Sequence, residues 1–338
     1  MPAELEFSAE DLAQLRFAVS PMWQLGTGFR LLRTGAAHPV HRSWLDQVRP
    51  RVAAAGLDAG WLAELVPATG YCPDFLNPAP AGPAPALVEE LDRIRATPAA
   101  VVRRELDHLA HHHGRLGPRL RTLYADPGAR LARVAEEIEA FWEVAIGPYW
   151  ARIRAVLDAD VFHRARQVAE YGPGRLLNEL HPAMSWAQGT LRLVRRRHTL
   201  ERGTAGQGLL LIPSVFKGPG LSTRVSLPDP PQLAYRARGT GTLWERRPVR
   251  GGEAVAAVLG RSRTRLLTEL DSPASTTDLA RRTGISAAAV SQHLIALRSA
   301  GLVSAHRAGR SVLYARTAVA DSVLAAADSA LHAAADPA

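Results

Sequence analysis

The chain has 338 residues, of which 47% are hydrophobic, and a formal net charge of +9. This length is enough for two or three domains. No apolar run is long enough to cross a bilayer, and the acidic start of the chain lacks the pattern of a signal peptide. The single cysteine, Cys72, excludes an intramolecular disulfide and is typical of a reducing compartment. We therefore expect a cytoplasmic protein that does not bind membranes.

Arginine supplies nearly all of the positive charge, because Lys217 is the only lysine. Such a composition is typical of a GC-rich genome, so the arginine count by itself says little about partners. Its distribution is more informative, since residues 250–317 contain ten arginines and four acidic residues. This local excess favours binding to the phosphates of a nucleic acid.

The first 190 residues are predicted to be largely helical. Ser8 and Asp11 resemble a capping box, which predicts an amphipathic helix that continues to Leu32. A cap followed by proline, at residues 97–98 and again at 126–127, predicts the start of two further helices.

Two other parts of the chain are not expected to be helical. Residues 67–85 are too rich in proline for a helix and predict a surface loop or an internal linker. Beyond them, short apolar or alternating runs separated by glycine and proline predict a small antiparallel sheet of roughly three or four strands. The expected strands are residues 190–197, 208–215, 223–227 and 232–238.

Residues 276–302 have the spacing of a helix-turn-helix. Leu279 and Ala280 lie on a short first helix, and Gly284 marks the turn, where a left-handed backbone is needed. Ser286 is placed to cap the second helix. The buried stripe of that helix is predicted to comprise Val290, Leu294 and Leu297. Its opposite face can lie in a major groove and carries Ser286, Ala287, Ala289, Ser291, Gln292 and His293.

A basic hairpin follows the two helices and completes a winged helix. Residues 303–306 and 311–315 predict two strands, joined by a turn that contains Arg307 and Arg310. These two arginines are expected to contact phosphates or enter a minor groove, and Arg281 and Arg282 are expected to contact the DNA backbone. Among the polar residues of the second helix, Ser291, Gln292 and His293 are the predicted base contacts.

The whole pattern predicts an α+β fold that is mostly α. We expect a helical sensor or dimerisation module over residues 1–190 and a small β region over 191–249. Residues 250–338 are expected to form a winged helix-turn-helix that binds double-stranded DNA, with a C-terminal dimerisation helix.

The C-terminal residues resemble the ArsR/SmtB family of winged-helix repressors. The resemblance rests on residues 290–297, 300–303, the wing at 309–310 with Tyr314, and the preceding segment 253–270. It implies a homodimer paired through the first and last helices of the domain, which places two recognition helices in successive major grooves. Repression by steric block is the output that the family implies, although the sequence does not distinguish a repressor from an activator.

The metal sites of that family are not matched. Residues 276–280 contain no thiol, and the last helix offers Asp321, Asp328 and a lone His332 without the Asp-x-His pattern. We therefore predict no metal at these positions. A separate helical triplet leaves zinc binding open, because side chains at i, i+3 and i+4 can converge; it comprises His108, His111 and His112.

The N-terminal part has a resemblance of its own. Residues 16–21, 211–216 and 235–244 are similar to an uncharacterised domain that precedes ArsR-type winged helices in high-GC bacteria. The similarity implies sensing or dimerisation and supplies no catalytic residues. Aromatic residues are concentrated in this part, which favours a pocket for a small-molecule effector.

No enzymatic constellation is found. The glycines at 203–208 precede a strand rather than a helix, Ser214 lacks a Gly-x-Ser-x-Gly setting, and nothing near Cys72 in sequence lowers its pKa. We therefore predict a regulator that is not an enzyme and needs no cofactor. The alternative that stays open is a ligand-binding or enzymatic N-terminal domain with the winged helix as a protein-interaction module.

Overall fold

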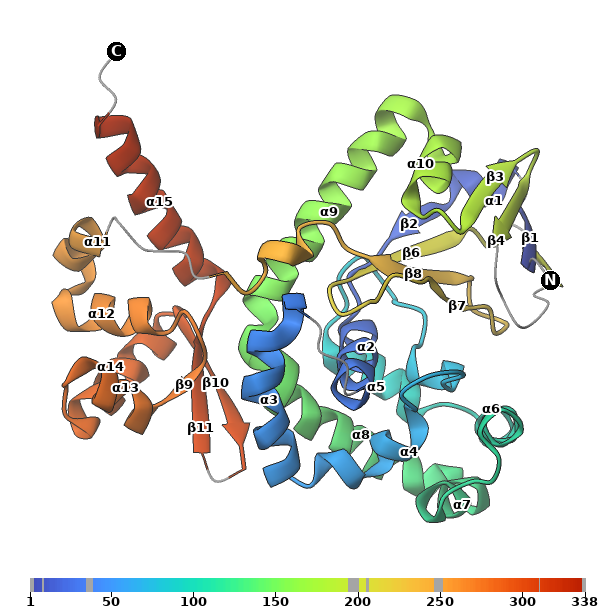
Figure 1. The fold of residues 1–338 in the computed structure, drawn as a ribbon, viewed down its shortest axis with the longest axis horizontal. Coiled ribbons are helices and arrows are strands. Elements are labelled where there is room, and N and C mark those ends of the chain that lie inside the picture. Colours follow the sequence, from blue (N-terminus) through green and yellow to red (C-terminus); the bar gives the residue numbers. More distant parts are fainter. Residues whose placement is uncertain are drawn as a thin grey trace. The chain divides into compact units, whose positions relative to one another are not determined.

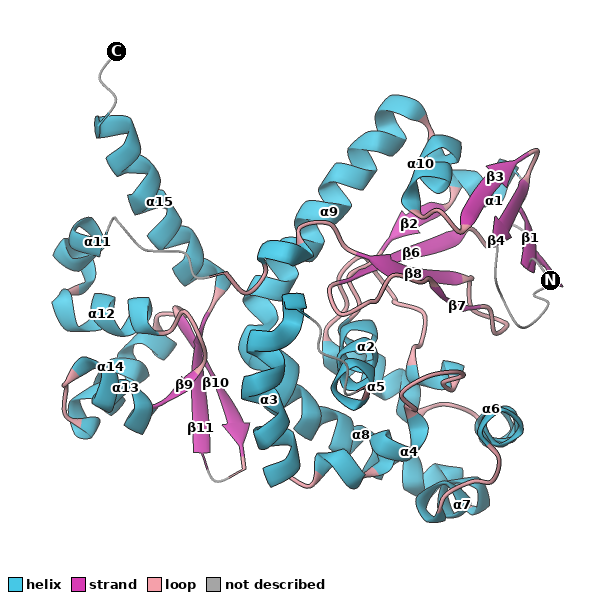
Figure 2. Cartoon of the chain, viewed as in Figure 1, coloured by secondary structure: helices cyan, strands magenta, loops and turns pink. Residues whose placement is uncertain are grey.

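The computed structural model describes residues 3–7, 9–34, 39–193, 201–204, 207–245, 252–309 and 311–335. Helices dominate, and strands form three small sheets, so the predicted α+β, mostly α class is confirmed (Figure 2). Within the described residues, no helix combines the length and the apolar character that crossing a membrane requires.

The chain divides into two compact units that are each assembled from separate stretches. Unit 1 contains described residues within 1–42, 57–138 and 156–241. Unit 2 contains those within 43–56, 139–155 and 242–338. Two segments of the N-terminal half therefore belong to the same compact unit as the C-terminal region. The three consecutive domains expected from the sequence, 1–190, 191–249 and 250–338, have boundaries that differ from those of the two compact units. This division into domains stays a prediction.

The helices of unit 1 come from all three of its stretches. They are α1 (Ala9–Ala13), α2 (Pro21–Arg33), α4 (Trp61–Leu65), α5 (Leu87–Arg95), α6 (Ala99–His113), α7 (Pro118–Ala125), most of α8 (Pro127–Phe141), most of α9 (Trp150–Tyr171) and α10 (Pro173–Leu180), with short helical turns η1 (Pro39–His41), η2 (Leu57–Ala59), η3 (Asp74–Leu76) and η6 (Thr240–Thr242). The start of α8 was predicted correctly, since Asp126 Oδ1 accepts a hydrogen bond of 3.2 Å from the backbone N–H of Ala129.

The single helix expected up to Leu32 is wrong. The chain forms α1, then the strand β2 (Leu15–Phe17), and then α2, which is capped by Ser20. Ser8 lies outside the described residues. Asp11 is buried and accepts a hydrogen bond of 3.0 Å from the backbone N–H of Gly208, so its carboxylate holds a segment that is distant in sequence.

Unit 1 contains two mixed sheets where one small antiparallel sheet was expected. The first has the order β3 (Met184–Ala187), β4 (Thr190–Leu193), β1 (Ala3–Phe7), β5 (Glu201–Thr204). The second has the order β2, β6 (Leu209–Ser214), β8 (Gln232–Arg236), β7 (Ser222–Arg224), and β6 is parallel to both of its neighbours. Every residue of β6 is buried, which is typical of a parallel strand covered on both faces. Four strands were not predicted: β1 and β2 at the N-terminus, and β3 and β5, and each has five residues or fewer, which is too short to show a clear period.

The proline-rich segment 67–85 has no regular structure beyond the turn η3, as expected for a loop, but much of it is packed into unit 1. Val19 donates its backbone N–H to the carbonyl of Pro83 at 2.8 Å, and Gln232 Nε2 donates to the carbonyl of Asn77 at 3.0 Å. Phe75 and Ala79 are buried. Proline has no backbone N–H, so a segment rich in it leaves fewer donors to satisfy when it is buried without regular structure.

Unit 2 is a winged helix with additional N-terminal segments (Figure 1). Its elements are α3 (Arg42–Ala54) from Ser43 onward, the π-helical turn η4 (Trp142–Ile146), η5 (Gly147–Tyr149), α11 (Gly252–Leu259), α12 (Arg261–Glu269), β9 (Ala274–Ser275), α13 (Thr276–Thr283), α14 (Ala287–Ser299), β10 (Val303–Ala308), β11 (Ser311–Arg316) and α15 (Ala318–Ala335). The winged-helix core is apolar and includes Leu266, Leu267, Leu279, Val290, Leu294, Leu297, Val303 and Ala320.

Candidate nucleic-acid interface

The first helix of the motif and its turn have the predicted geometry. Ser275 and Asp278 form a capping box, in which Ser275 Oγ accepts a hydrogen bond of 3.2 Å from the backbone N–H of Asp278. The helix ends at Gly284, whose φ of 69° is left-handed. Its N–H donates to the carbonyl of Ala280 at 2.9 Å, and this sharp stop allows α14 to cross α13.

The second helix, α14, is oriented by its buried stripe. Val290, Leu294 and Leu297 are buried in the core, as predicted. Ser286 Oγ accepts a hydrogen bond of 3.3 Å from the backbone N–H of Ala289, so the predicted N-cap is also confirmed. Because one stripe faces the core, the opposite side of α14 faces solvent and can enter a groove.

The residues predicted to face a major groove differ in solvent exposure. Ser286, Ala287 and Gln292 are exposed, whereas Ala289, Ser291 and His293 are half-buried. Sequence reasoning missed Ile295, which lies three residues after Gln292 and is 61% exposed. An exposed isoleucine on this face has the chemistry to contact a thymine methyl group. Its position outside the buried stripe was the signal that could have identified it.

The arginines of the motif have different settings. Arg281 is exposed, and its Nη2 donates a hydrogen bond of 2.8 Å to Asp278 Oδ1. Hydrogen bonds from Ser275, with the charge of Arg281 nearby, lower the pKa of the Asp278 carboxyl. Arg282 is exposed and forms no hydrogen bond or ion pair with another described residue. Four further exposed arginines were not singled out from the sequence: Arg261, Arg263, Arg265 and Arg298.

The wing is a regular hairpin. β10 and β11 are antiparallel, with partners from Val303 opposite Arg316 to Ala308 opposite Ser311. Arg307 is exposed near the tip, and Gly309 in the turn has a φ of 61°. The two predicted strands are therefore confirmed. Arg310, the second predicted wing contact, lies outside the described residues.

Exposed apolar side chains lie on the first and last helices of the winged helix, which are in contact with each other. Val258 on α11 is 83% exposed, and Val319 and Val323 on α15 are 57% and 38% exposed. The last two are four residues apart and therefore share one face of α15. Exposed apolar side chains on one element pair are typical of a surface that another protein covers.

The histidine triplet and the cysteine of unit 1 are poorly suited to metal binding or catalysis. The rings of His108 and His112 pack on Tyr71, with centroids 6.1 and 5.4 Å away. Across the described residues, no group of three or more histidine, cysteine, aspartate or glutamate side chains could hold a metal ion. Burial raises the pKa of the Cys72 thiol to about 11, so this thiol is protonated and a weak nucleophile at neutral pH.

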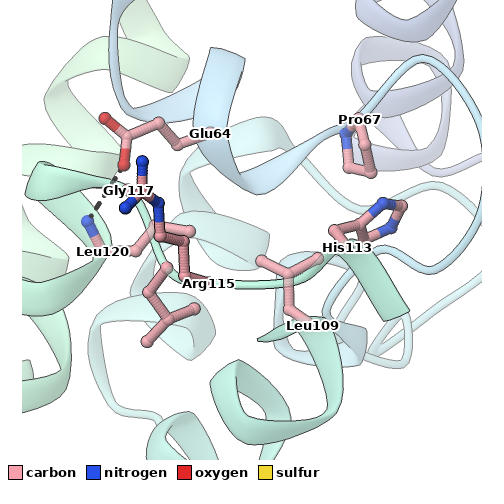
Figure 3. A pocket seen from close by; sticks show the side chains of 8 residues that line it. Glu64, Pro67, Leu109, His113, Arg115, Gly117 and Leu120 are labelled. Atoms are coloured by element: carbon pink, nitrogen blue, oxygen red, sulfur yellow. Dashed lines mark hydrogen bonds between the residues drawn. The ribbon is translucent and has the colours of Figure 1, made fainter. Parts of the chain in front are cut away.

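Unit 1 has a small pocket of about 160 Å³ at its surface (Figure 3). Pro67 and His113 lie on one side, and Glu64, Gly117 and Leu120 lie on the other. Glu64 Oε2 accepts a hydrogen bond of 3.2 Å from the backbone N–H of Leu120. The remaining lining residues are Leu109, Arg115 and Leu116, so a mostly apolar wall is combined with one guanidinium.

Comparison with protein families gives two matches. Residues 264–305 match the model described as bacterial regulatory protein, arsR family. Residues 97–241 match a family of unknown function (DUF5937). No curated protein and no solved structure matches the chain. The first match covers most of α12, the two helices of the motif and the start of the wing. The second covers most of the described helices and strands of unit 1.

Proposed function

We propose that this chain, an ArsR-type DNA-binding transcriptional regulator whose N-terminal region belongs to a family of unknown function, acts as a homodimeric repressor under the control of an effector. The observation that carries the proposal is the solvent-facing side of α14, which has Gln292 at its centre and exposed arginines on neighbouring elements.

Base recognition is assigned to α14. Gln292 is exposed and can form two hydrogen bonds with an adenine in the major groove. Ser291 and His293 flank it in sequence, and Ser286, Ala287 and Ala289 line the N-terminal end, where small side chains let the helix approach the bases. A good pair of hydrogen bonds to one base contributes about 1–3 kcal/mol of discrimination against the wrong base.

Backbone contacts are assigned to arginines on α13 and the wing. Arg281, Arg282, Arg307 and Arg310 have the charge and reach to bind phosphates, and such contacts orient a protein on DNA without reading its sequence. Each phosphate contact also releases counterions, so affinity for any duplex falls as the salt concentration rises.

Three exposed valines on α11 and α15 support pairing with a second copy of the chain, namely Val258, Val319 and Val323. A twofold dimer through α11 and α15 carries two copies of α14, and successive major grooves on one face of DNA are about 34 Å apart. An effector bound to the N-terminal module would then act by changing that separation, since a shift of a few ångströms prevents simultaneous docking. The pocket near Glu64 is the candidate site for such a molecule.

The test is selection of bound genomic fragments by the full chain, repeated at several salt concentrations and with cell extracts that supply an effector. We expect a small set of fragments that share a twofold-symmetric sequence, with affinity that falls steeply as salt rises. Sedimentation of the complex should give two chains per site. Retention of no fragment at any salt concentration would contradict the proposal and favour a protein-interaction role for the winged helix.

A further inference from the structure

The wing of unit 2 is attached to a segment that lies far from it in sequence. Residues 139–155, which we call the strap, form η4, η5 and the adjoining helix ends. Glu143 in η4 accepts two hydrogen bonds from β10 through the same oxygen, Oε2. Nδ1 of His306 lies 3.1 Å away and the backbone N–H of Arg307 lies 3.3 Å away. One carboxylate therefore holds two successive residues of the wing.

This attachment provides a hydrogen-bond acceptor at the edge of the wing's sheet. The sheet order is β10-β11-β9, so β10 is an edge strand with one side unpaired by other strands. Unpaired N–H groups at a sheet edge need a partner or become a site for unwanted pairing. The carboxylate of Glu143 is such a partner for Arg307 and leaves the arginine side chain exposed.

Packing at the same place leaves no spare room. A Cβ atom added to Gly147 would lie 2.9 Å from His306 Nδ1 and 2.9 Å from Trp142 Nε1. The rings of Trp142 and Trp150 lie 5.0 Å apart, and His306 Nε2 lies 2.9 Å from Ser304 Oγ. The strap and β10 are thus in close contact around the imidazole, which is itself largely buried.

A second attachment holds the base of the wing. Arg152 of the strap donates to the backbone carbonyls of Asp271 at 3.1 Å and Glu245 at 2.7 Å. Asp271 Oδ1 in turn accepts a hydrogen bond of 3.2 Å from Arg316, the last residue of β11. The strap is therefore connected to both strands of the hairpin, at Glu143 near the tip and through Arg152 at the base.

We propose that Glu143 is a positioning residue for DNA binding, which holds the wing at His306 and Arg307 so that the Arg307 side chain meets the DNA backbone. The inference rests on the proposed role of Arg307 as a phosphate contact. The strap lies within residues 97–241, the segment that matches the family of unknown function, so the inference assigns a role to part of that segment.

Charge alone does not explain a carboxylate at this position. An anionic group beside a phosphate-binding wing repels DNA, and the hydrogen bond from His306 lowers the pKa of Glu143, which keeps it ionised at neutral pH. A residue that opposes binding through its charge, yet accepts hydrogen bonds from the wing, fits a positioning role. Loss of Glu143 therefore has two opposite effects, a small gain from removed repulsion and a larger loss from a mobile wing.

The experiment compares Glu143→Ala and Glu143→Gln with Glu139→Gln in the full chain. Glu139 is an exposed carboxylate of the strap one turn earlier, so its variant removes the same charge and leaves the hydrogen bonds from His306 and Arg307 to Glu143 in place. The probe is the genomic duplex that the wild-type chain retains most tightly, and a duplex of random sequence serves beside it. Arg307→Ala is made in the wild-type and in each variant background, so that the two sites form double-mutant cycles.

We expect Glu143→Ala to weaken binding to both duplexes by about fivefold, because a wing that is in place only part of the time reduces the binding-competent fraction. Glu143→Gln keeps an acceptor for the N–H of Arg307 and should have a smaller effect in the same direction. Glu139→Gln should leave affinity unchanged or raise it slightly. The decisive result is the cycle, in which Arg307→Ala should cost much less affinity once Glu143 is removed.

Equal costs of Arg307→Ala in the wild-type and Glu143→Ala backgrounds would overturn the inference, since a purely structural role leaves the two sites independent. If Glu143→Ala fails to fold, as judged by circular dichroism, the Glu143→Gln cycle decides in the same way. Failure of the wild-type chain to bind any duplex would instead overturn the proposed function, and the inference with it. The two failures are therefore distinguishable.

Discussion

Charged side chains are placed differently in the two units. In unit 1 several charged groups are buried among the described residues, namely Asp11, Glu90, Glu105, Asp160, Arg164 and Arg224. In unit 2 the buried polar side chains of the described residues are hydroxyls, those of Thr264 and Thr283. The winged helix thus has an apolar core, and its most buried guanidinium, the 8% exposed side chain of Arg316, is paired with Asp271 and Asp321. The arginines of the helix-turn-helix and the wing tip are exposed, where a polyanion can bind them.

The four buried carboxylates of unit 1 share one function. Each accepts a hydrogen bond from a backbone N–H in a remote segment: Asp11 from Gly208, Glu90 from Met22, Glu105 from Phe75, and Asp160 from Arg238. A buried N–H without a partner is costly, so these carboxylates replace the pairing that regular structure would give. The comparison teaches that unit 1 depends on its buried ionisable groups and should respond to changes in their charge, whereas unit 2 should respond to changes in packing and capping.

The largest effect is expected at Asp160. Its oxygens accept hydrogen bonds from the Tyr235 hydroxyl at 2.7 Å and the Arg238 N–H at 3.0 Å, and Arg164 lies 3.8 Å away. Asp160→Ala leaves a buried guanidinium without its counter-charge, which costs about 3–5 kcal/mol of unfolding free energy. Denaturant unfolding measures the loss, with the exposed Asp158→Ala as control. Equal stability of the two variants would contradict the assigned role.

Glu90 makes the stability of unit 1 depend on pH. Burial raises the pKa of Glu90 from 4.5 to about 7, despite hydrogen bonds from Ser20 and Met22. Between these values the unfolded chain has lost the proton and the folded chain still holds it. The free energy of unfolding therefore falls as pH rises from 4.5 to 7, by up to about 3 kcal/mol for this group, and is flat above that.

Glu90→Gln should remove this contribution, because an amide stays neutral at every pH. We expect denaturant unfolding at pH 5 and pH 8 to show a smaller decline for this variant than for the wild type. Burial raises the pKa of Glu105 to about 7 as well, so part of the decline should remain. The exposed Glu89→Gln serves as control and should keep most of the decline, because the Glu89 charge is the smallest contribution to the raised pKa of Glu90. An identical decline in all three proteins would show that Glu90 ionises normally in the fold.

A packing change tests unit 2 in the complementary way. Gly147→Ala places a methyl group against the rings of His306 and Trp142, and overpacking of this kind costs about 1–3 kcal/mol. Gly252→Ala is the matched control, because nothing lies within 4 Å of its added Cβ. Thermal unfolding of both variants gives the comparison. A tolerated Gly147→Ala would mean that the strap and the wing are less tightly packed than described.

The smallest effect is expected at a helix cap. Ser286→Ala removes the acceptor of the Ala289 N–H at the start of α14, which costs about 1 kcal/mol. The same substitution at Ser322, an exposed serine within α15, should be neutral or slightly stabilising because alanine favours helix. Chemical unfolding distinguishes them. Equal stabilities would indicate that water replaces the cap without loss.

The parts of the molecule that the sequence predicted are those fixed by near neighbours. Gly284 and Ser286 act within a few residues of themselves, so the helix-turn-helix and its exposed face could be predicted. Asp11 and Glu143 act on partners that are 197 and 163 residues away in sequence, and nothing in the pattern around them indicates the contact. For the same reason the division of the chain into units and the attachment of the wing required the structure.

The central claim is that α14 reads bases while the arginines bind only the backbone. It is tested most directly by measuring the affinity of Gln292→Ala and Arg307→Ala for the selected genomic duplex and for a random duplex, across a range of salt. We expect Gln292→Ala to lose about 1–3 kcal/mol on the selected duplex alone, and Arg307→Ala to weaken binding to both with a flatter salt dependence. Equal losses by both variants on both duplexes would contradict the account.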